Sequence, residues 1–137
     1  MKGVFLDLAS LAEQDLDLSA FEKVVDDWQT YPATAAQERQ GHIGDAGIVV
    51  TNKVVLDDAI LRAAPKLKLI CLTATGYNNV AVDTARELGI VVSNVVGYAT
   101  DSVVQHVFAL MLAHQTRLFD YTAAVKRGDW SNSPQFC

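Results

Sequence analysis

A short polar loop carries the residues of this chain that are best suited to chemistry. Residues 73–79 read Thr-Ala-Thr-Gly-Tyr-Asn-Asn. Small, hydroxyl-bearing residues around a glycine let successive backbone N–H groups converge on an anion such as a carboxylate, and Lys53 could add positive charge from a neighbouring loop. The same residues also suit an ordinary loop, in which Gly76 makes a tight turn and Asn78 and Asn79 cap the next helix. Spacing alone favours this second interpretation, because glycine and asparagine occur in turns of many kinds.

The spacing of glycine and histidine argues against two other kinds of site. The glycines stand at positions 3, 41, 44, 47, 76, 89, 97 and 128, so no two are separated by a single residue. The G-x-G-x-x-G turn that brings a pyrophosphate to a helix N-terminus is therefore excluded. His106 and His114 have no Asp, Glu or Cys three or four residues after them, so we expect no metal site and no catalytic pair there.

Composition restricts the class of protein. Of the 137 residues, 50% are hydrophobic and 20% are charged, with a net charge of −5, which fits one domain with a buried core. The absence of a Lys or Arg run argues against nucleic acid or an anionic membrane as a partner. No apolar stretch approaches membrane-spanning length. Cys71 and the terminal Cys137 make no disulfide framework, so we expect a cytoplasmic protein.

Strand and helix patterns alternate along the chain and predict the elements that position the polar loop. The expected strands are residues 4–6, 28–31, 47–50, 67–72 and 90–92. The expected helices are 18–25 with Ser19 as cap, 34–42 closed by Gly44, 57–64, 82–88 closed by Gly89, and 101–126 with Thr100 as cap. Regular alternation predicts a flavodoxin-like, doubly wound five-stranded parallel sheet in a three-layer α/β/α fold.

Ligands of such a sheet lie beyond the carboxyl ends of the strands. The residues expected there are Asp7, 51–53, 73–79 and 93–94. A flavin-binding protein would need a Thr/Ser-rich loop after the first strand, and a receiver domain would need Asp and Lys where Thr51 and Ser93 stand, so neither class fits. The last helix is apolar on nearly all sides and must be buried, either within this fold or against another chain.

Several blocks of the sequence resemble the D-2-hydroxyacid dehydrogenase family, in particular its hydroxypyruvate reductase (glycerate dehydrogenase) members. The blocks are residues 72–80, 85–94, 97–100 with 103–110, and the tail 127–136. The sequence departs from the family pattern at Ala81, where members usually carry Asp, and at Val96, where they usually carry Pro.

The resemblance implies one half of a two-domain enzyme. Residues 1–99 would form the substrate-binding domain, 100–127 a long helix that covers the sheet or swaps into a partner to give a homodimer, and 128–137 the start of a linker to a Rossmann domain. In the family, backbone amides that correspond to Ala74, Thr75 and Gly76 bind the substrate carboxylate. The resemblance also implies that Asn52 and Lys53 border the substrate.

The family reduces small 2-oxo acids such as hydroxypyruvate or glyoxylate with NAD(H) or NADP(H), and Thr100 is implied to lie near the cofactor. Its catalytic His, Arg and Glu belong to the later domain, so we expect this chain alone to be inactive and to hold no cofactor by itself. The alternative is a stand-alone flavodoxin-like binding or assembly module, whether a natural or an engineered truncation.

Overall fold

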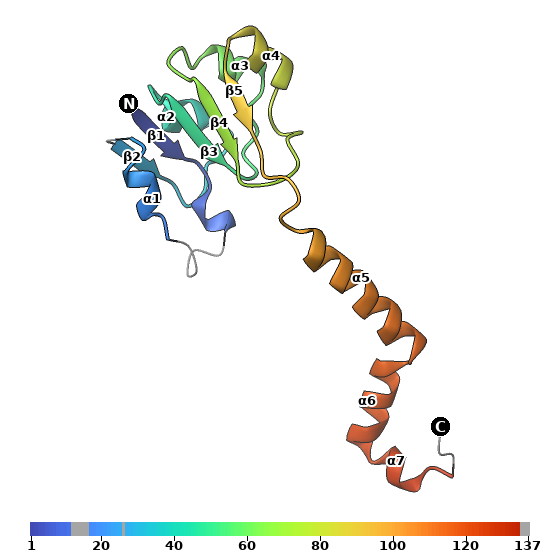
Figure 1. The fold of residues 1–137 in the computed structure, drawn as a ribbon. Helices are drawn as coiled ribbons and strands as arrows, with labels where there is room; N and C mark the ends of the chain where they lie inside the picture. Colours follow the sequence, from blue (N-terminus) through green and yellow to red (C-terminus); the bar gives the residue numbers. More distant parts are fainter. Residues whose placement is uncertain (12–16, 26, 135–137) are drawn as a thin grey trace. The chain divides into compact units, whose positions relative to one another are not determined.

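The computed structural model describes residues 1–11, 17–25 and 27–134. The chain divides into two compact units, Met1–Val96 and Gly97–Cys137. The first unit contains the sheet, and the described residues of the second unit form helices and no strand (Figure 1).

The first unit is built on a five-stranded sheet in the order β2-β1-β3-β4-β5, in which every pairing is parallel. The strands are β1 (Lys2–Phe5), β2 (Asp27–Thr30), β3 (Ile48–Thr51), β4 (Leu69–Leu72) and β5 (Val91–Ser93). This order is the flavodoxin-like one, so the predicted sheet is confirmed. The apolar, mostly β-branched sequence of β3 suits its central position, where all four residues are buried.

Helices cover the two faces of the sheet unequally. On one face, α2 (Arg39–Ile43), α3 (Asp58–Arg62) and α4 (Val82–Glu87) contribute to the larger hydrophobic cluster. That cluster contains Val4, Ile43, Val49, Leu61, Ile70 and Ala85, among others. On the other face, Phe5, Ile48 and Val50 pack with Phe21 of α1 (Ser19–Glu22). Because successive strand residues point to opposite faces, these two clusters define the predicted three layers.

Only some of the helix ends in this unit lie where the local sequence predicts them. The Asp57 carboxylate accepts a hydrogen bond from the Ile60 N–H at 3.0 Å and caps α3. Gly89 has a φ of 71°, so it ends α4 as expected. The prediction of a helix from residue 34 is wrong, because α2 begins at Arg39 and the Thr34 hydroxyl instead donates to the Leu6 carbonyl of a distant segment.

Ser19 was expected to cap the helix that starts near it, and this is wrong. The capping position is Leu18, and no side chain caps the helix there. The Ser19 N–H instead donates to the Asp17 carboxylate at 2.9 Å. The short 3-10 helix η1 (Leu8–Ser10) follows β1 and was not predicted.

The second unit contains three helices in place of the single one predicted from residue 101 to 126. They are α5 (Thr100–Gln115), α6 (Leu118–Arg127) and α7 (Asp129–Asn132). Arg117 adopts a left-handed backbone with a φ of 50° and interrupts the helix, while its guanidinium pairs with Asp120 at 2.9 Å. Thr100 does not cap α5, because the capping position is Ala99 and no side chain serves there. Helix α7 lies within the stretch expected as a linker, of which residues 135–137 are outside the described range.

The apolar side chains of α5 are not covered by the rest of their own unit. Val103, Phe108 and Leu112 are 58%, 57% and 62% exposed. Ala113 is the buried residue of this helix. The predicted burial of this surface therefore requires something beyond α6 and α7. Among the residues with described structure, no helix combines the length and the apolar character needed to cross a bilayer.

Candidate functional site

The carboxyl edge of the sheet brings two loops together. Strands β3 and β4 pair in parallel with Thr51 opposite Leu72, and the Thr73 N–H donates to the Thr51 carbonyl at 3.0 Å. The loop that follows β3, residues 52–57, and the loop that follows β4, residues 73–80, therefore start side by side. A parallel bridge between Leu56 and Val80 joins them again further along.

The loop after β4 is held by its carbonyl groups. The Ala74 carbonyl accepts from the Val95 N–H at 3.0 Å, and the Thr75 carbonyl accepts from Asn94 Nδ2 at 2.7 Å. The Thr75 hydroxyl donates to the Val95 carbonyl at 2.8 Å. Within the described parts of the chain, nothing accepts a hydrogen bond from the backbone N–H groups of Ala74, Thr75 or Gly76. Three consecutive donors are thus available to an anion.

The ordinary-turn interpretation of this loop is wrong about helix capping. Gly76 itself is not among the glycines with positive φ, which are Gly44, Gly89, Gly97 and Gly128. Neither Asn78 nor Asn79 caps α4, because the capping position is Ala81 and no side-chain bond forms there. A Cβ atom at position 76 would lie 3.3 Å from Asn78 Oδ1, so glycine keeps this part of the loop uncrowded.

The loop after β3 is arranged in the opposite way, because its backbone N–H groups are used internally. The buried carboxylate of Asp7 accepts from the Asn52 N–H at 2.9 and 3.1 Å and from the Lys53 N–H at 2.6 Å. The Thr51 hydroxyl accepts from the Val54 N–H at 3.1 Å. Both carboxylate oxygens of Asp7 therefore accept hydrogen bonds from this loop and stabilise its conformation.

The Asn52 and Lys53 side chains are left without a hydrogen-bonding or ionic partner in the portion of the chain that is described. Lys53 is exposed and borders two adjoining hollows of the surface. Both hollows are also lined by Thr34 and Val54. Asp7 and Asp57 also line these hollows, but Lys53 forms no ion pair with any described residue. Its loop starts beside the loop that carries the free N–H groups, so this edge of the sheet can attract anions.

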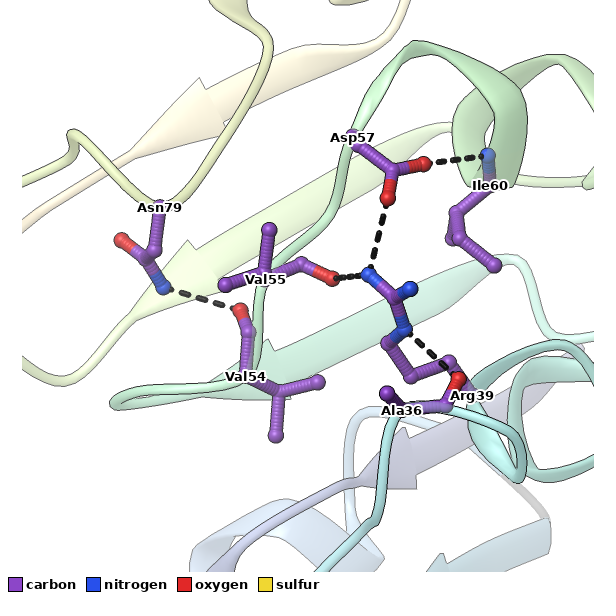
Figure 2. A network of polar contacts seen from close by, with 7 residues as sticks. All are labelled: Ala36, Arg39, Val54, Val55, Asp57, Ile60 and Asn79. Atoms are coloured by element: carbon purple, nitrogen blue, oxygen red, sulfur yellow. Dashed lines mark hydrogen bonds and ion pairs between the residues drawn. The ribbon is translucent and has the colours of Figure 1, made fainter.

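Asn79 links the two loops, as Figure 2 shows. Its side-chain Nδ2 donates to the Val54 carbonyl at 3.0 Å. Its backbone carbonyl accepts from the Leu56 N–H at 2.7 Å, and the Leu56 carbonyl accepts from the Ala81 N–H at 2.9 Å. The carboxyl-edge loops therefore behave as one structural unit.

The structure thus groups five of the six predicted site residues on adjoining loops: Ala74, Thr75, Gly76, Asn52 and Lys53. Thr100, His106 and His114 belong to α5 in the second unit. Asn79 and Arg39 both contact the loop after β3, and neither was among the predicted site residues. No spacing pattern could have shown them, because both act on residues distant in sequence.

Neither a pyrophosphate-binding turn nor a cluster of metal ligands accompanies these loops in the described residues. The sequence contains no pair of glycines one residue apart for a pyrophosphate turn. In the ranges that the structure describes, no three His, Cys, Asp or Glu side chains gather to hold a metal ion. The Cys71 thiol lies in β4, where partial burial raises its pKa above the ordinary value of 9.0 and makes it a poor nucleophile.

The sequence matches the model of one known protein family. The family model for the catalytic domain of D-isomer specific 2-hydroxyacid dehydrogenases matches residues 7–128, a range that includes both carboxyl-edge loops. The chain belongs to this family. The D-2-hydroxyacid dehydrogenase resemblance predicted from the sequence blocks is therefore confirmed.

Curated D-2-hydroxyacid dehydrogenase relatives match along the whole chain. A Haemophilus influenzae protein named as a 2-hydroxyacid dehydrogenase is 38% identical over 100% of this chain and 43% of its own length. A hydroxypyruvate reductase of Blautia hydrogenotrophica is 35% identical, again over 100% of this chain and 43% of its own. The chain thus spans less than half the length of the curated relatives it matches.

Solved structures of other proteins share the fold. An acyclic imino acid reductase in complex with NADPH and D-Arg superposes with a TM-score of 0.79 at 20% identity, over 93% of this chain and 41% of that one. The D-lactate dehydrogenase of Aquifex aeolicus, complexed with NAD and lactic acid, gives 0.72 at 22% identity, over 91% and 37%. At these identities the likeness concerns the fold alone.

Proposed function

We propose that this chain is the substrate-binding domain of an NAD(P)-dependent D-2-hydroxyacid dehydrogenase that reduces a small 2-oxo acid, such as hydroxypyruvate or glyoxylate. The observation that carries the proposal is the set of unbonded N–H groups at Ala74, Thr75 and Gly76. Relatives named hydroxypyruvate reductase, glycerate dehydrogenase and glyoxylate reductase support the choice of substrate.

In this proposal the chain binds and orients the oxo acid. The three N–H groups donate to the substrate carboxylate. They need little reorganisation, because the Val95 N–H and Asn94 Nδ2 already donate to the carbonyls of Ala74 and Thr75 and hold the loop. Lys53 adds positive charge at the same edge, and Asn52 offers an amide beside it. A carboxylate fixed in this way places the adjacent carbonyl carbon in a defined position, which is the entropic contribution of binding to catalysis.

The nicotinamide cofactor supplies the hydride in such a reaction, and we propose that it is bound by a Rossmann domain outside this sequence. A proton donor beside the substrate carbonyl is also required, and His106 and His114 are not proposed for that role. On this basis the chain alone binds substrate without turnover. Thr100, at the start of α5, is proposed to lie near the cofactor in the whole enzyme.

We further propose that the apolar surface of α5 packs against a second copy of the chain to form a homodimer. This proposal rests on the exposure of Val103, Phe108 and Leu112 within their own unit. A dimer by light scattering that becomes a monomer in Phe108→Glu would support it. A wild-type monomer would favour a helix that folds back on its own chain, and a heterogeneous aggregate would contradict both arrangements.

A reducing cytoplasm fits the free thiol at Cys71 and remains part of the proposal. The alternative function, a binding or assembly module without an enzymatic partner, predicts the same fold. It differs in having no preference for 2-oxo acids.

An amide NMR titration with glyoxylate and, separately, with NADH tests the proposal. We expect glyoxylate to shift the amide signals of Ala74, Thr75 and Gly76 and expect no response to NADH. Acetate is the matched control, because it carries a carboxylate but no 2-oxo group. Equal shifts with acetate and glyoxylate would reduce the site to a general anion loop, and no shift with either would contradict the proposed function.

A further inference from the structure

Arg39 is nearly buried and makes three directed contacts at the carboxyl edge of the sheet (Figure 2). Its side chain is 17% exposed. Nη1 donates to the Val55 carbonyl at 2.7 Å and to the Asp57 carboxylate at 2.9 Å. Nε donates to the Ala36 carbonyl at 2.8 Å, which fixes the guanidinium plane to the segment that precedes α2. The planar geometry of arginine suits such simultaneous contacts, whereas a lysine could satisfy fewer of them.

The segment that Arg39 holds is also the segment that Asn79 holds. We call residues 54–57 the strap. Arg39 binds the strap at Val55 and Asp57, and Asn79 binds it at Val54 and Leu56. The strap therefore connects α2 to the end of the loop that contains residues 74–76.

Arg39 is already paired with a carboxylate and is therefore not the cation that would attract a ligand anion. The Asp57 carboxylate faces the guanidinium, and its pKa lies below the usual value of 3.8, mainly because the Ile60 N–H donates to it and also because of Arg39. Arg39 is thus neutralised by a group of the strap itself. Lys53, at the start of the same loop, has no such partner in the described residues and remains the available cation.

From these contacts we infer that Arg39 and Asn79 are positioning residues for the substrate-carboxylate loop, acting through the strap. Neither contributes one of the three free N–H groups. Their contacts fix the strap against the loop after β4, and this determines where the N–H groups of residues 74–76 point. The inference rests on the proposed function, because it names the residues that prepare that same site for its ligand.

Four variants of the full chain test the inference: Arg39→Gln, Arg39→Lys, Asn79→Ala and the double variant Arg39→Gln/Asn79→Ala. We expect glyoxylate to bind about tenfold more weakly to Arg39→Gln and to Asn79→Ala, because small displacements of positioned donors have large effects on binding. Arg39→Lys should recover part of the loss. If both residues act through the strap, the double variant should bind less weakly than the product of the two single effects predicts.

Arg62→Gln is the matched control. Arg62 also bridges two carboxylates, Asp58 at 3.0 Å and Glu87 at 2.9 Å, but it does so between α3 and α4 and bonds to no residue of the strap. We expect thermal stability to fall in this variant without any change in glyoxylate affinity. An affinity loss equal to that of Arg39→Gln would show a general stability effect and would overturn the inference.

A second measurement needs no ligand and separates this inference from the proposed function. In amide spectra of the free chain, Arg39→Gln should shift the Thr75 and Gly76 signals, whereas Arg62→Gln should not. If these signals shift but wild type binds no glyoxylate, the proposed function fails and the positioning role stands. If they do not move in a folded Arg39→Gln or Arg39→Lys variant, the positioning role is wrong.

Discussion

The two carboxyl-edge loops use their backbone groups in opposite ways. After β3, the N–H groups of Asn52 and Lys53 are taken up by the Asp7 carboxylate. After β4, the N–H groups of residues 74–76 have no partner among the described residues, while the carbonyls of Ala74 and Thr75 are bonded. The comparison shows that loop composition alone does not identify a binding loop. The distribution of satisfied and unsatisfied donors distinguishes the two loops, because a ligand can reach the exposed N–H groups after β4, whereas those of Asn52 and Lys53 are already bonded.

The largest expected effect comes from breaking the internally satisfied loop. Asp7→Ala leaves the N–H groups of Asn52 and Lys53 without their acceptor, and we expect a loss of about 3 kcal/mol of unfolding free energy. Urea denaturation measures this loss. Asp83→Ala is the control, because the Asp83 side chain is 93% exposed and its ion pair is with the exposed Arg86, so a change within about 0.5 kcal/mol is expected. Equal losses in the two variants would contradict the role assigned to Asp7.

A pair of glycine substitutions separates binding from stability. Gly76→Ala places a Cβ atom 3.3 Å from Asn78 Oδ1 without requiring a left-handed backbone, so stability should change by less than about 0.5 kcal/mol. Glyoxylate affinity should fall roughly fivefold, because the added methyl group crowds the free N–H groups.

Gly89→Ala should behave in the reverse way. Its φ of 71° disfavours any L side chain, and we expect a stability loss of about 1 kcal/mol with unchanged glyoxylate affinity. Urea denaturation and the NMR titration measure the two effects on the same variants. Parallel losses of stability and affinity in both variants would show that the affinity loss in Gly76→Ala follows from lower stability and not from crowding of the free N–H groups.

The smallest expected effect is the pH dependence that comes from Asp57, the last residue of the strap. The pKa of Asp57 is lowered below 3.8, first by the Ile60 N–H and also by Arg39, so the folded state favours the ionised carboxylate. Its contribution to stability is therefore present above pH 3.8 and is lost as the pH falls through the lower, folded-state pKa. Carboxyl ¹³C NMR should show Asp57 titrating below 3.8, and Arg39→Gln should raise that midpoint. A midpoint at or above 3.8 in wild type would show that the capping contacts are absent in solution.

The fold could be predicted from sequence because each strand and most helices are defined locally. The continuous apolar run of β3 and the left-handed Gly89 after α4 have the same meaning in any parallel α/β fold. The predictions failed where a nonlocal or unusual backbone choice decided the result. Thr34 bonds to Leu6, 28 residues away, in place of starting a helix. Arg117 adopts a left-handed conformation that non-glycine residues seldom take, and this divides the predicted long helix.

For the site, the sequence by itself determined the inventory: a small polar loop with one glycine, a lysine on the preceding loop, and a parallel sheet whose carboxyl edge presents both. Only the tertiary structure decided which N–H groups are free. Asp7 reaches the Asn52 N–H across 45 residues, Asn79 reaches Val54 across 25, and Arg39 reaches Asp57 across 18. The physical reason is that a backbone donor bonds to whichever acceptor the fold brings within hydrogen-bonding distance. Residue spacing along the chain does not predict which acceptor that will be.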